Sequence, residues 1–251
     1  MNKITIDHFS LAYSDGTQAL REISLEIPEN QIFVVFGPAG GGKSSLLRSL
    51  NRLNDLADVV KMEGTVQLDG EDIFQPSYDV IQLRRKVGMV FARPVVLPLT
   101  IRGNLTYGLT VAGISDQARL DRAVETSLQK AALWEEVRDR LDDPAVALSG
   151  GQQQRLCLAR VLALEPEVIL LDEPTSGLDP ISTGKVEESL QELKKEYTIV
   201  LVPHSVQQAA RTADIAAFLL QGDLIETNRG EVLFNKPVDQ RTQDYIQGRF
   251  G

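Results

Sequence analysis

The chain has 251 residues, 43% of them hydrophobic and 24% charged, which is the balance of a soluble globular protein with one large domain or two lobes. Its formal net charge of −9 argues against a nucleic-acid partner, because Lys and Arg make most contacts to phosphate backbones. The single cysteine, Cys157, excludes an internal disulfide, and its apolar helical context predicts a buried thiol in a reducing compartment.

Hydropathy predicts neither a leader nor a membrane span. Residues 1–7 lack the apolar region of a signal peptide. No apolar run approaches the roughly 20 residues that cross a bilayer. We therefore expect a cytoplasmic protein that acts at the membrane only through a partner.

Apolar and polar residues alternate near the start of the chain. Residues 4–13 and 20–27 are predicted strands, and Asp15-Gly16 supplies a turn between them. Because such alternation indicates a sheet with one wet face, an antiparallel β lobe is expected at the N-terminus.

Three short, continuous apolar runs follow, at residues 31–36, 168–171 and 198–202. They favour strands buried on both faces of a parallel sheet, and helical stretches separate them, so an α/β nucleotide-binding core is predicted. Residues 116–132 have apolar residues at helical spacing, which is expected to continue through residue 141. We predict one domain: residues 1–92 and 165–251 form the β lobe and α/β core, and residues 93–164 form an inserted helical lobe.

A glycine-rich loop directly follows the first apolar run. It fits the G-x-x-x-x-G-K-[ST] pattern that wraps nucleotide phosphates, with the residues Gly37-Pro38-Ala39-Gly40-Gly41-Gly42-Lys43-Ser44. A strand before it and a helix after it place backbone N–H groups at the positive end of a helix dipole. We predict that the loop and Ser45 bind ATP, that Lys43 reaches the β and γ phosphates, and that Ser44 ligates Mg²⁺. The alternative is a glycine-rich turn with an incidental lysine.

A second glycine motif lies more than a hundred residues later, before another predicted helix; its residues are Leu148-Ser149-Gly150-Gly151-Gln152. A single nucleotide is not expected to need both motifs from the same copy. Two anion-binding helix starts so far apart predict two chains that pair head to tail, each completing the ATP site of the other.

Two acidic residues end the apolar run at 168–171. Asp172 suits a carboxylate that holds Mg²⁺ through water. Glu173 suits a general base that accepts a hydrogen bond from the attacking water. Acidic residues at strand ends are also common caps, but the upstream phosphate loop favours the catalytic interpretation.

Together these motifs resemble the ATPase of ABC transporters. The resemblance rests on Leu148-Ser149-Gly150-Gly151-Gln152-Gln153-Gln154-Arg155 as the signature and on Leu171-Asp172-Glu173-Pro174 as the acidic strand end. It implies the P-loop ABC ATPase fold, with an N-terminal antiparallel β lobe, a parallel-sheet core and an inserted helical subdomain. It also implies ATP and Mg²⁺ as ligands.

Three further positions are assigned through this resemblance. Ser176-Gly177-Leu178-Asp179 is similar to the D-loop, which adds Asp179 to the nucleotide site. His204 falls where the switch histidine of the family contacts the γ-phosphate; the alternative is a core histidine. Tyr13 matches the aromatic residue that stacks on adenine; the alternative is an ordinary strand aromatic.

A closer resemblance, covering nearly the whole chain, is to the ATPase subunit of bacterial phosphate importers of the Pst type. It rests on segments outside the general motifs: residues 51–56, 131–137, 152–157, 207–211 and 244–251. It implies an ATP-dependent, head-to-tail homodimer on the inner face of the cell membrane, beneath two integral membrane permease subunits. An external phosphate-binding protein would be an indirect partner.

The chain departs from the family pattern at two positions near the predicted site. Ala92 stands where the family has the Q-loop glutamine, which touches Mg²⁺ and the attacking water, and Pro203 replaces a threonine before His204. The favoured interpretation is a working ATPase with slower or differently coupled turnover, because the other site residues remain: Lys43, Asp172, Glu173 and His204. The alternatives are a non-transporting, regulatory ATPase with weakened hydrolysis, or an importer of another oxyanion such as tungstate or molybdate. The apolar loop at residues 94–99 is the predicted contact for a membrane subunit.

Overall fold

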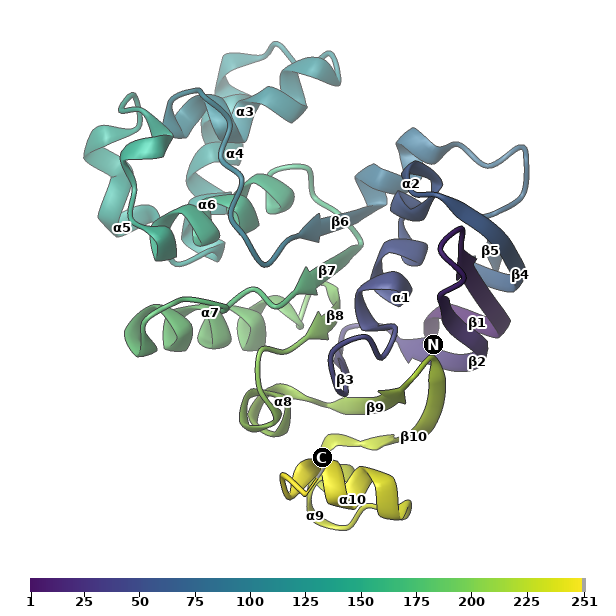
Figure 1. Ribbon diagram of the computed structural model, residues 1–251. Helices are drawn as coiled ribbons and strands as arrows, with labels where there is room; N and C mark the ends of the chain where they lie inside the picture. The colour runs from purple at the N-terminus through teal and green to yellow at the C-terminus, as the bar shows by residue number, and fades with distance from the viewer. Residues whose placement is uncertain (250–251) are drawn as a thin grey trace.

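Two β-sheets organise the computed structural model, which describes residues 1–249 (Figure 1). Phe250 and Gly251, the end of the C-terminal segment used in the importer resemblance, lie outside the described residues. In the part of the chain that the structure describes, no helix combines the length and apolar character needed to cross a membrane.

The first sheet is antiparallel and has the strand order β2-β1-β4-β5. The alternation predicted for the second strand is clear, since Ile23, Leu25 and Ile27 are buried while Ser24 and Glu26 face solvent. The antiparallel N-terminal lobe is therefore confirmed. Its strands are β1 (Asn2–Tyr13), β2 (Gln18–Pro28), β4 (Val59–Leu68) and β5 (Glu71–Asp72).

The second sheet has the order β10-β9-β3-β8-β7-β6, and all neighbours in it are parallel except the edge strand β10. Every residue of its three central strands is buried, because helices or the first sheet cover both faces. The predicted parallel core is confirmed. The strands are β3 (Ile32–Phe36), β6 (Val87–Val90), β7 (Val168–Asp172), β8 (Thr198–Val202), β9 (Ile215–Leu220) and β10 (Asp223–Arg229).

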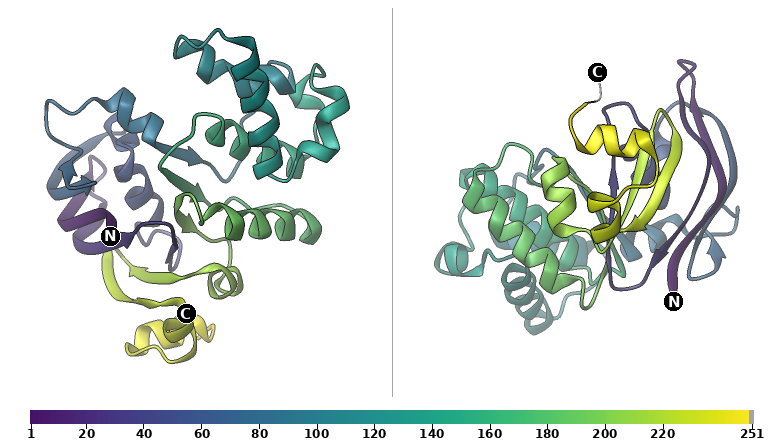
Figure 2. Two further views of the ribbon diagram at one scale, coloured as in Figure 1. Left: turned by 180° about the vertical axis from the view of Figure 1, so that it is seen from behind. Right: turned by 90° about the horizontal axis from the view of Figure 1, so that it is seen from below.

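The helices divide between the two faces of this sheet. The first sheet and the helical lobe lie on opposite sides of the parallel sheet (Figure 2). Helices near the sheets are α1 (Lys43–Leu50), η1 (Leu53–Leu56), α2 (Val80–Lys86), α7 (Pro180–Leu193), α8 (Val206–Thr212), α9 (Gly230–Asn235) and α10 (Gln240–Ile246). Those of the lobe are α3 (Ile101–Val111), α4 (Gln117–Lys130), α5 (Trp134–Val137), η2 (Arg138–Arg140), η3 (Ala145–Ala147) and α6 (Gly150–Leu162). The exact division at residues 93 and 164 stays a prediction.

The expected continuous helical pattern from residue 116 to residue 141 is wrong in one respect. Helix α4 ends at Lys130, and Ala132 adopts a left-handed conformation with φ of 51°. That turn stops the helix, and only the single turn of α5 and the 3₁₀ turn η2 follow it. Apolar spacing alone does not reveal a break made by an alanine.

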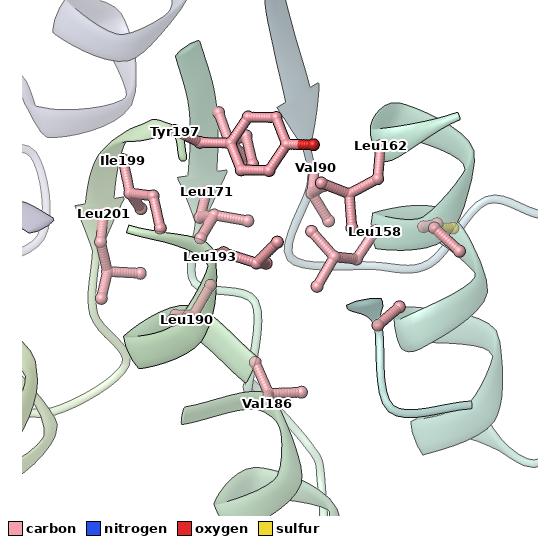
Figure 3. Packing of buried hydrophobic residues seen from close by; sticks show 14 of the residues in the cluster. Val90, Leu158, Leu162, Leu171, Val186, Leu190, Leu193, Tyr197, Ile199 and Leu201 are labelled. Carbon is pink, nitrogen blue, oxygen red and sulfur yellow. The ribbon is translucent and has the colours of Figure 1, made fainter. Parts of the chain in front are cut away.

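Helix α6 anchors the helical lobe to the core. Leu158 and Leu162 of α6 face Leu171 of β7 and Leu193 of α7 in one buried cluster (Figure 3). Because protein interiors are close-packed, this cluster fixes the C-terminal half of α6 against β7 and α7.

Candidate functional site

The sequence-predicted residues converge where the parallel strands end. Gly37 follows β3, Asp172 is the last residue of β7, and His204 comes two residues after β8. Ligands of open α/β sheets bind outside these carboxyl ends. A cavity of about 190 Å³ opens there, and its lining includes Lys43 and Glu173.

The glycine-rich loop has a conformation that only glycine fits at two positions. Gly37 has φ of 145°, and a Cβ there would lie 2.0 Å from the carbonyl oxygen of Leu219. Gly42 has φ of 97°, and its Cβ would lie 2.3 Å from the carbonyl oxygen of Ala19. The loop therefore packs against β9 and β2 while it turns into α1, as a phosphate cradle requires.

Lys43 spans this loop. Its Nζ donates hydrogen bonds to the carbonyl oxygens of Gly37, at 2.9 Å, and Pro38, at 2.8 Å. Burial lowers the pKa of Lys43, although the charges of Glu173 and Asp172 act in the opposite direction. An anionic phosphate group in the loop would stabilise the charged ammonium further.

The two predicted Mg²⁺ ligands are adjacent. The Ser44 hydroxyl donates to Oδ1 of Asp172 at 3.1 Å, although the residues are 128 positions apart in the chain. Hydroxyl and carboxylate oxygens are the ligand types that Mg²⁺ prefers, and it commonly completes its shell with water and phosphate. The residues present therefore fit this ion.

Glu173 and His204 share the wall of the cavity. Glu173 has φ of 48°, a conformation uncommon for a residue with a side chain, and its amide donates to the carbonyl oxygen of Val202 at 2.9 Å. The exposed His204 is not a core histidine. Its backbone N–H donates to the buried side chain of Gln208 at 2.9 Å, and Gln208 also accepts a hydrogen bond from Thr175.

Tyr13 lies beside the first turn of α1. Its hydroxyl is 3.0 Å from Oγ of Ser45 and 3.3 Å from Oδ1 of Asn54. Asn54 is buried and also donates to Ser49, so it holds the tyrosine in place. Sequence reasoning gave no site role to Asn54 or Gln208, although both lie in the importer-like segments, because neither belongs to a phosphate motif. Their hydrogen bonds to distant parts of the chain become visible only in the fold.

The second glycine motif does not join this cavity within the same chain. Ser149 and Gln152 cap α6 reciprocally, at 3.3 Å and 3.0 Å, and Gly150 is exposed beside them. Gly151 packs against Ser182 of α7, and Asp179 caps that helix. None of the five lines the cavity around Lys43, which is what the head-to-tail prediction requires.

Ala92 follows β6, whose Val90 pairs with Leu171 of β7, so it lies near the acidic strand end. The side chain of Gln154 donates to the carbonyl oxygen of the neighbouring Phe91 at 2.9 Å. In the adjoining predicted contact loop, Val95 is 63% exposed and Leu99 is 40% exposed. These exposures agree with the expectation that residues 94–99 present an apolar surface, and their contact with a membrane subunit stays a prediction.

An ion cluster around Glu136 offers a test of stability against pH. Hydrogen bonds from Arg155, with further ones from Lys185 and Gln152, hold the pKa of Glu136 at about 2, below its ordinary value of 4.5. Because the folded-state pKa is depressed, the stabilisation is present above pH 4.5 and is lost as the pH falls towards 2.

We expect the parent to lose about 1–2 kcal/mol more unfolding free energy than Glu136→Gln across this interval, allowing for solvent screening. Urea unfolding at pH 7, 4.5, 3 and 2 measures the difference. Glu135→Gln, at a neighbouring exposed site, should lose as much unfolding free energy as the parent. If Glu136→Gln also loses as much as the parent between pH 4.5 and pH 2, Glu136 is not the source of the pH dependence.

Comparisons with known proteins place this geometry in a family. The family model described as ABC transporter matches residues 20–176, more than half of the chain. The structure of CbiO1 from Clostridium perfringens, described as part of the ABC transporter complex CbiONQ, superposes with a TM-score of 0.81 and 26% identity, over 99% of this chain and 96% of that one. A bacterial Atm1-family ABC exporter with ATP bound gives a TM-score of 0.82 and 25% identity over the whole of this chain, which spans 42% of the exporter chain. The predicted ABC ATPase fold is confirmed, and the chain belongs to the ABC transporter family.

Proposed function

We propose that this chain is the ATP-binding and ATP-hydrolysing subunit of a membrane importer, with inorganic phosphate as its cargo. The observation that carries the ATPase assignment is the Ser44–Asp172 hydrogen bond beside Lys43 and Glu173. This contact supports the proposal because the side chains assigned to phosphate, Mg²⁺ and water all come from the carboxyl ends of neighbouring strands or from the loop and helix after β3.

Each group has a distinct task in this proposal. The loop amides and Lys43 bind the β and γ phosphates of ATP, and Tyr13 stacks on the adenine. Ser44 and Asp172 would hold Mg²⁺, which would supply positive charge against the phosphate oxygens. Glu173 accepts a proton from the attacking water, and His204 donates a hydrogen bond to the γ-phosphate.

A second copy completes the site. Ser149, Gly151 and Asp179 belong to the proposed nucleotide set but do not line the cavity of their own chain. An ATP-dependent, head-to-tail homodimer brings the helix start of one copy to the γ-phosphate held by the other. ATP then bridges the two chains, and its hydrolysis allows them to separate.

The helical lobe contributes a groove of about 550 Å³ that suits a membrane subunit. Its lining combines the exposed arginines Arg85, Arg119 and Arg122 with the apolar Leu109 and Ile114. We propose that an acidic cytoplasmic segment of a permease subunit docks here and against residues 94–99, because three arginines against one glutamate give the groove a positive lining in a chain with a net charge of −9. Two copies would then serve two permease subunits at the inner face of the cell membrane. Co-purification of permease subunits with the tagged chain tests this docking.

Phosphate as cargo rests on the importer-like segments, since an ATPase subunit does not contact the cargo. Tungstate or molybdate is the alternative within the same function, and an external binding protein would select among them. Uptake of radiolabelled phosphate in a deletion strain separates these candidates. Unchanged uptake would exclude phosphate.

Steady-state hydrolysis of Mg²⁺-ATP by the purified chain tests the enzyme assignment, and Ala92→Gln tests the substitution in the Q-loop. We expect clear turnover in the parent and a gain of less than about tenfold in Ala92→Gln, because the chain retains Glu173, the proposed general base, and Lys43, the proposed phosphate ligand. Ala118→Gln, at an exposed position of α4, serves as the control.

The regulatory alternative gives a different result in this assay. Ala92 is the observation that favours it, and the retained Glu173 and His204 oppose it. If the parent is inactive and Ala92→Gln restores turnover, the chain is a nucleotide-switched protein without sustained hydrolysis.

A further inference from the structure

One carboxylate connects three segments of the molecule. Glu136 of α5 accepts hydrogen bonds from both terminal nitrogens of Arg155, at 2.9 Å and 3.0 Å. It also accepts one from Nε2 of Gln152 at 3.0 Å and one from Nζ of Lys185 at 2.5 Å. We call these four residues the Glu136 cluster.

The cluster binds the first turns of α6 through hydrogen bonds from Gln152 and Arg155 to Glu136. Gln152 uses both ends of its amide: Oε1 accepts from the backbone of Ser149, and Nε2 donates to Glu136. Arg155, one turn further, is 3% exposed, and Glu136 is the carboxylate that pairs with it. A buried guanidinium fixes its partner closely, because leaving it unpaired costs several kcal/mol.

Lys185 extends the cluster to α7, the helix that begins after Asp179. The two helix starts also touch at Gly151, where a Cβ would lie 2.5 Å from Oγ of Ser182. Ser182 in turn donates to the carboxylate of Asp179 at 2.6 Å. Lys185 also binds the carboxylate that accepts from Gln152 and Arg155, so Glu136 connects α7 to the first turns of α6 through side chains.

We propose that the bond between Lys185 and Glu136 locks the first turn of α6 to α7, so that Ser149 and Asp179 face a second copy as one rigid unit. The inference rests on the proposed head-to-tail pairing, to which both turns contribute. Lys185 and Glu136 are positioning residues in this scheme, because neither lines the cavity around Lys43. Holding the two turns in place before pairing lowers the ordering cost of association.

Lys185→Met is the substitution that isolates this connection. It removes the ammonium and keeps much of the aliphatic stem, while the buried pair of Arg155 with Glu136 stays intact. The Lys185 side chain is 41% exposed, so the fold should tolerate the change. Lys195→Met is the matched control, since Lys195 is 65% exposed and its ion pair among the described residues is the local one with Glu192. Lys185→Arg restores the charge.

Two measurements test the proposal. The first is the dimer dissociation constant, measured by sedimentation in the Glu173→Gln background with Mg²⁺-ATP. We expect Lys185→Met to raise this constant about tenfold, because each of the two copies loses its partly exposed ion pair between Lys185 and Glu136. ATP affinity of the monomer should stay unchanged, and Lys185→Arg should recover most of the loss. In the monomer without nucleotide, amide hydrogen exchange should quicken in peptides from the first turns of α6 and α7.

The outcomes separate the two ideas. Unchanged exchange in Lys185→Met overturns the lock, and so does an unchanged dimer constant. An equal rise of the dimer dissociation constant in Lys195→Met also overturns the lock, because the loss of any one positive charge would then explain the effect. If Glu173→Gln itself stays monomeric with ATP, the pairing function fails, and the exchange result alone decides whether Lys185 joins the helices. The emission of Trp134, the only tryptophan and a member of α5, reports the same region independently.

Discussion

Glu173→Gln is expected to lower Mg²⁺-ATP hydrolysis by about 10²- to 10⁴-fold, the range that a lost general base typically costs. The amide is nearly the same size as the carboxylate but cannot accept a proton at neutral pH. The phosphate loop does not depend on this side chain, since Lys43 is held by backbone carbonyls of its own loop. ATP should therefore still bind, and the ATP-bound pair should accumulate because the step that separates it is blocked.

The measurement combines steady-state phosphate release with gel filtration in the presence of Mg²⁺-ATP. Glu188→Gln is a suitable control, because Glu188 is an exposed acidic residue of α7 away from the cavity. Turnover within about twofold of the parent in Glu173→Gln would remove the residue from the role of general base. A chain that hydrolyses slowly yet never dimerises would instead contradict the pairing.

Much of the fold was predictable because its signals are local. The apolar runs ending at Phe36, Leu171 and Val202 indicate strands buried on both faces, and these became β3, β7 and β8. The motif glycines likewise indicate a tight loop before a helix, which Gly37 and Gly42 confirm by their conformations. Local patterns were enough to predict these segments, because the apolar runs and the glycines each favour one backbone structure by themselves.

The supporting residues were not predictable, since their roles depend on long-range contacts. Asn54, Gln208 and Glu136 are ordinary polar residues in the sequence, and only packing brings them to Tyr13, His204 and Arg155 respectively. The left-handed Ala132 was missed for a related reason. Its carbonyl accepts a hydrogen bond from Arg155, 23 positions later, and no local preference of alanine announces that turn.

Gly37→Ala is expected to have the second large effect, on stability and on nucleotide binding together. An added Cβ would lie 2.0 Å from the carbonyl oxygen of Leu219, well inside contact distance, and that atom belongs to the backbone of β9. The sheet cannot yield there without disturbing the β3–β9 pairing, in which Phe36 aligns with Phe218. The φ of 145° adds strain for any residue with a side chain.

We therefore expect Gly37→Ala to lose about 3 kcal/mol or more of unfolding free energy, as overpacked sites do at the severe end, and to bind ATP at least about tenfold more weakly. Gly40→Ala separates backbone strain from steric overlap. Gly40 has φ of 73°, but within residues 1–249 no atom lies within 4 Å of the added Cβ, so the loss of unfolding free energy should be only about 1–2 kcal/mol. Urea unfolding and equilibrium ATP binding measure both quantities. Equal losses in the two variants would mean that backbone strain, and not the close approach of β9, makes Gly37 necessary. A larger loss in Gly37→Ala would show that the parallel sheet itself holds the phosphate loop in its binding conformation.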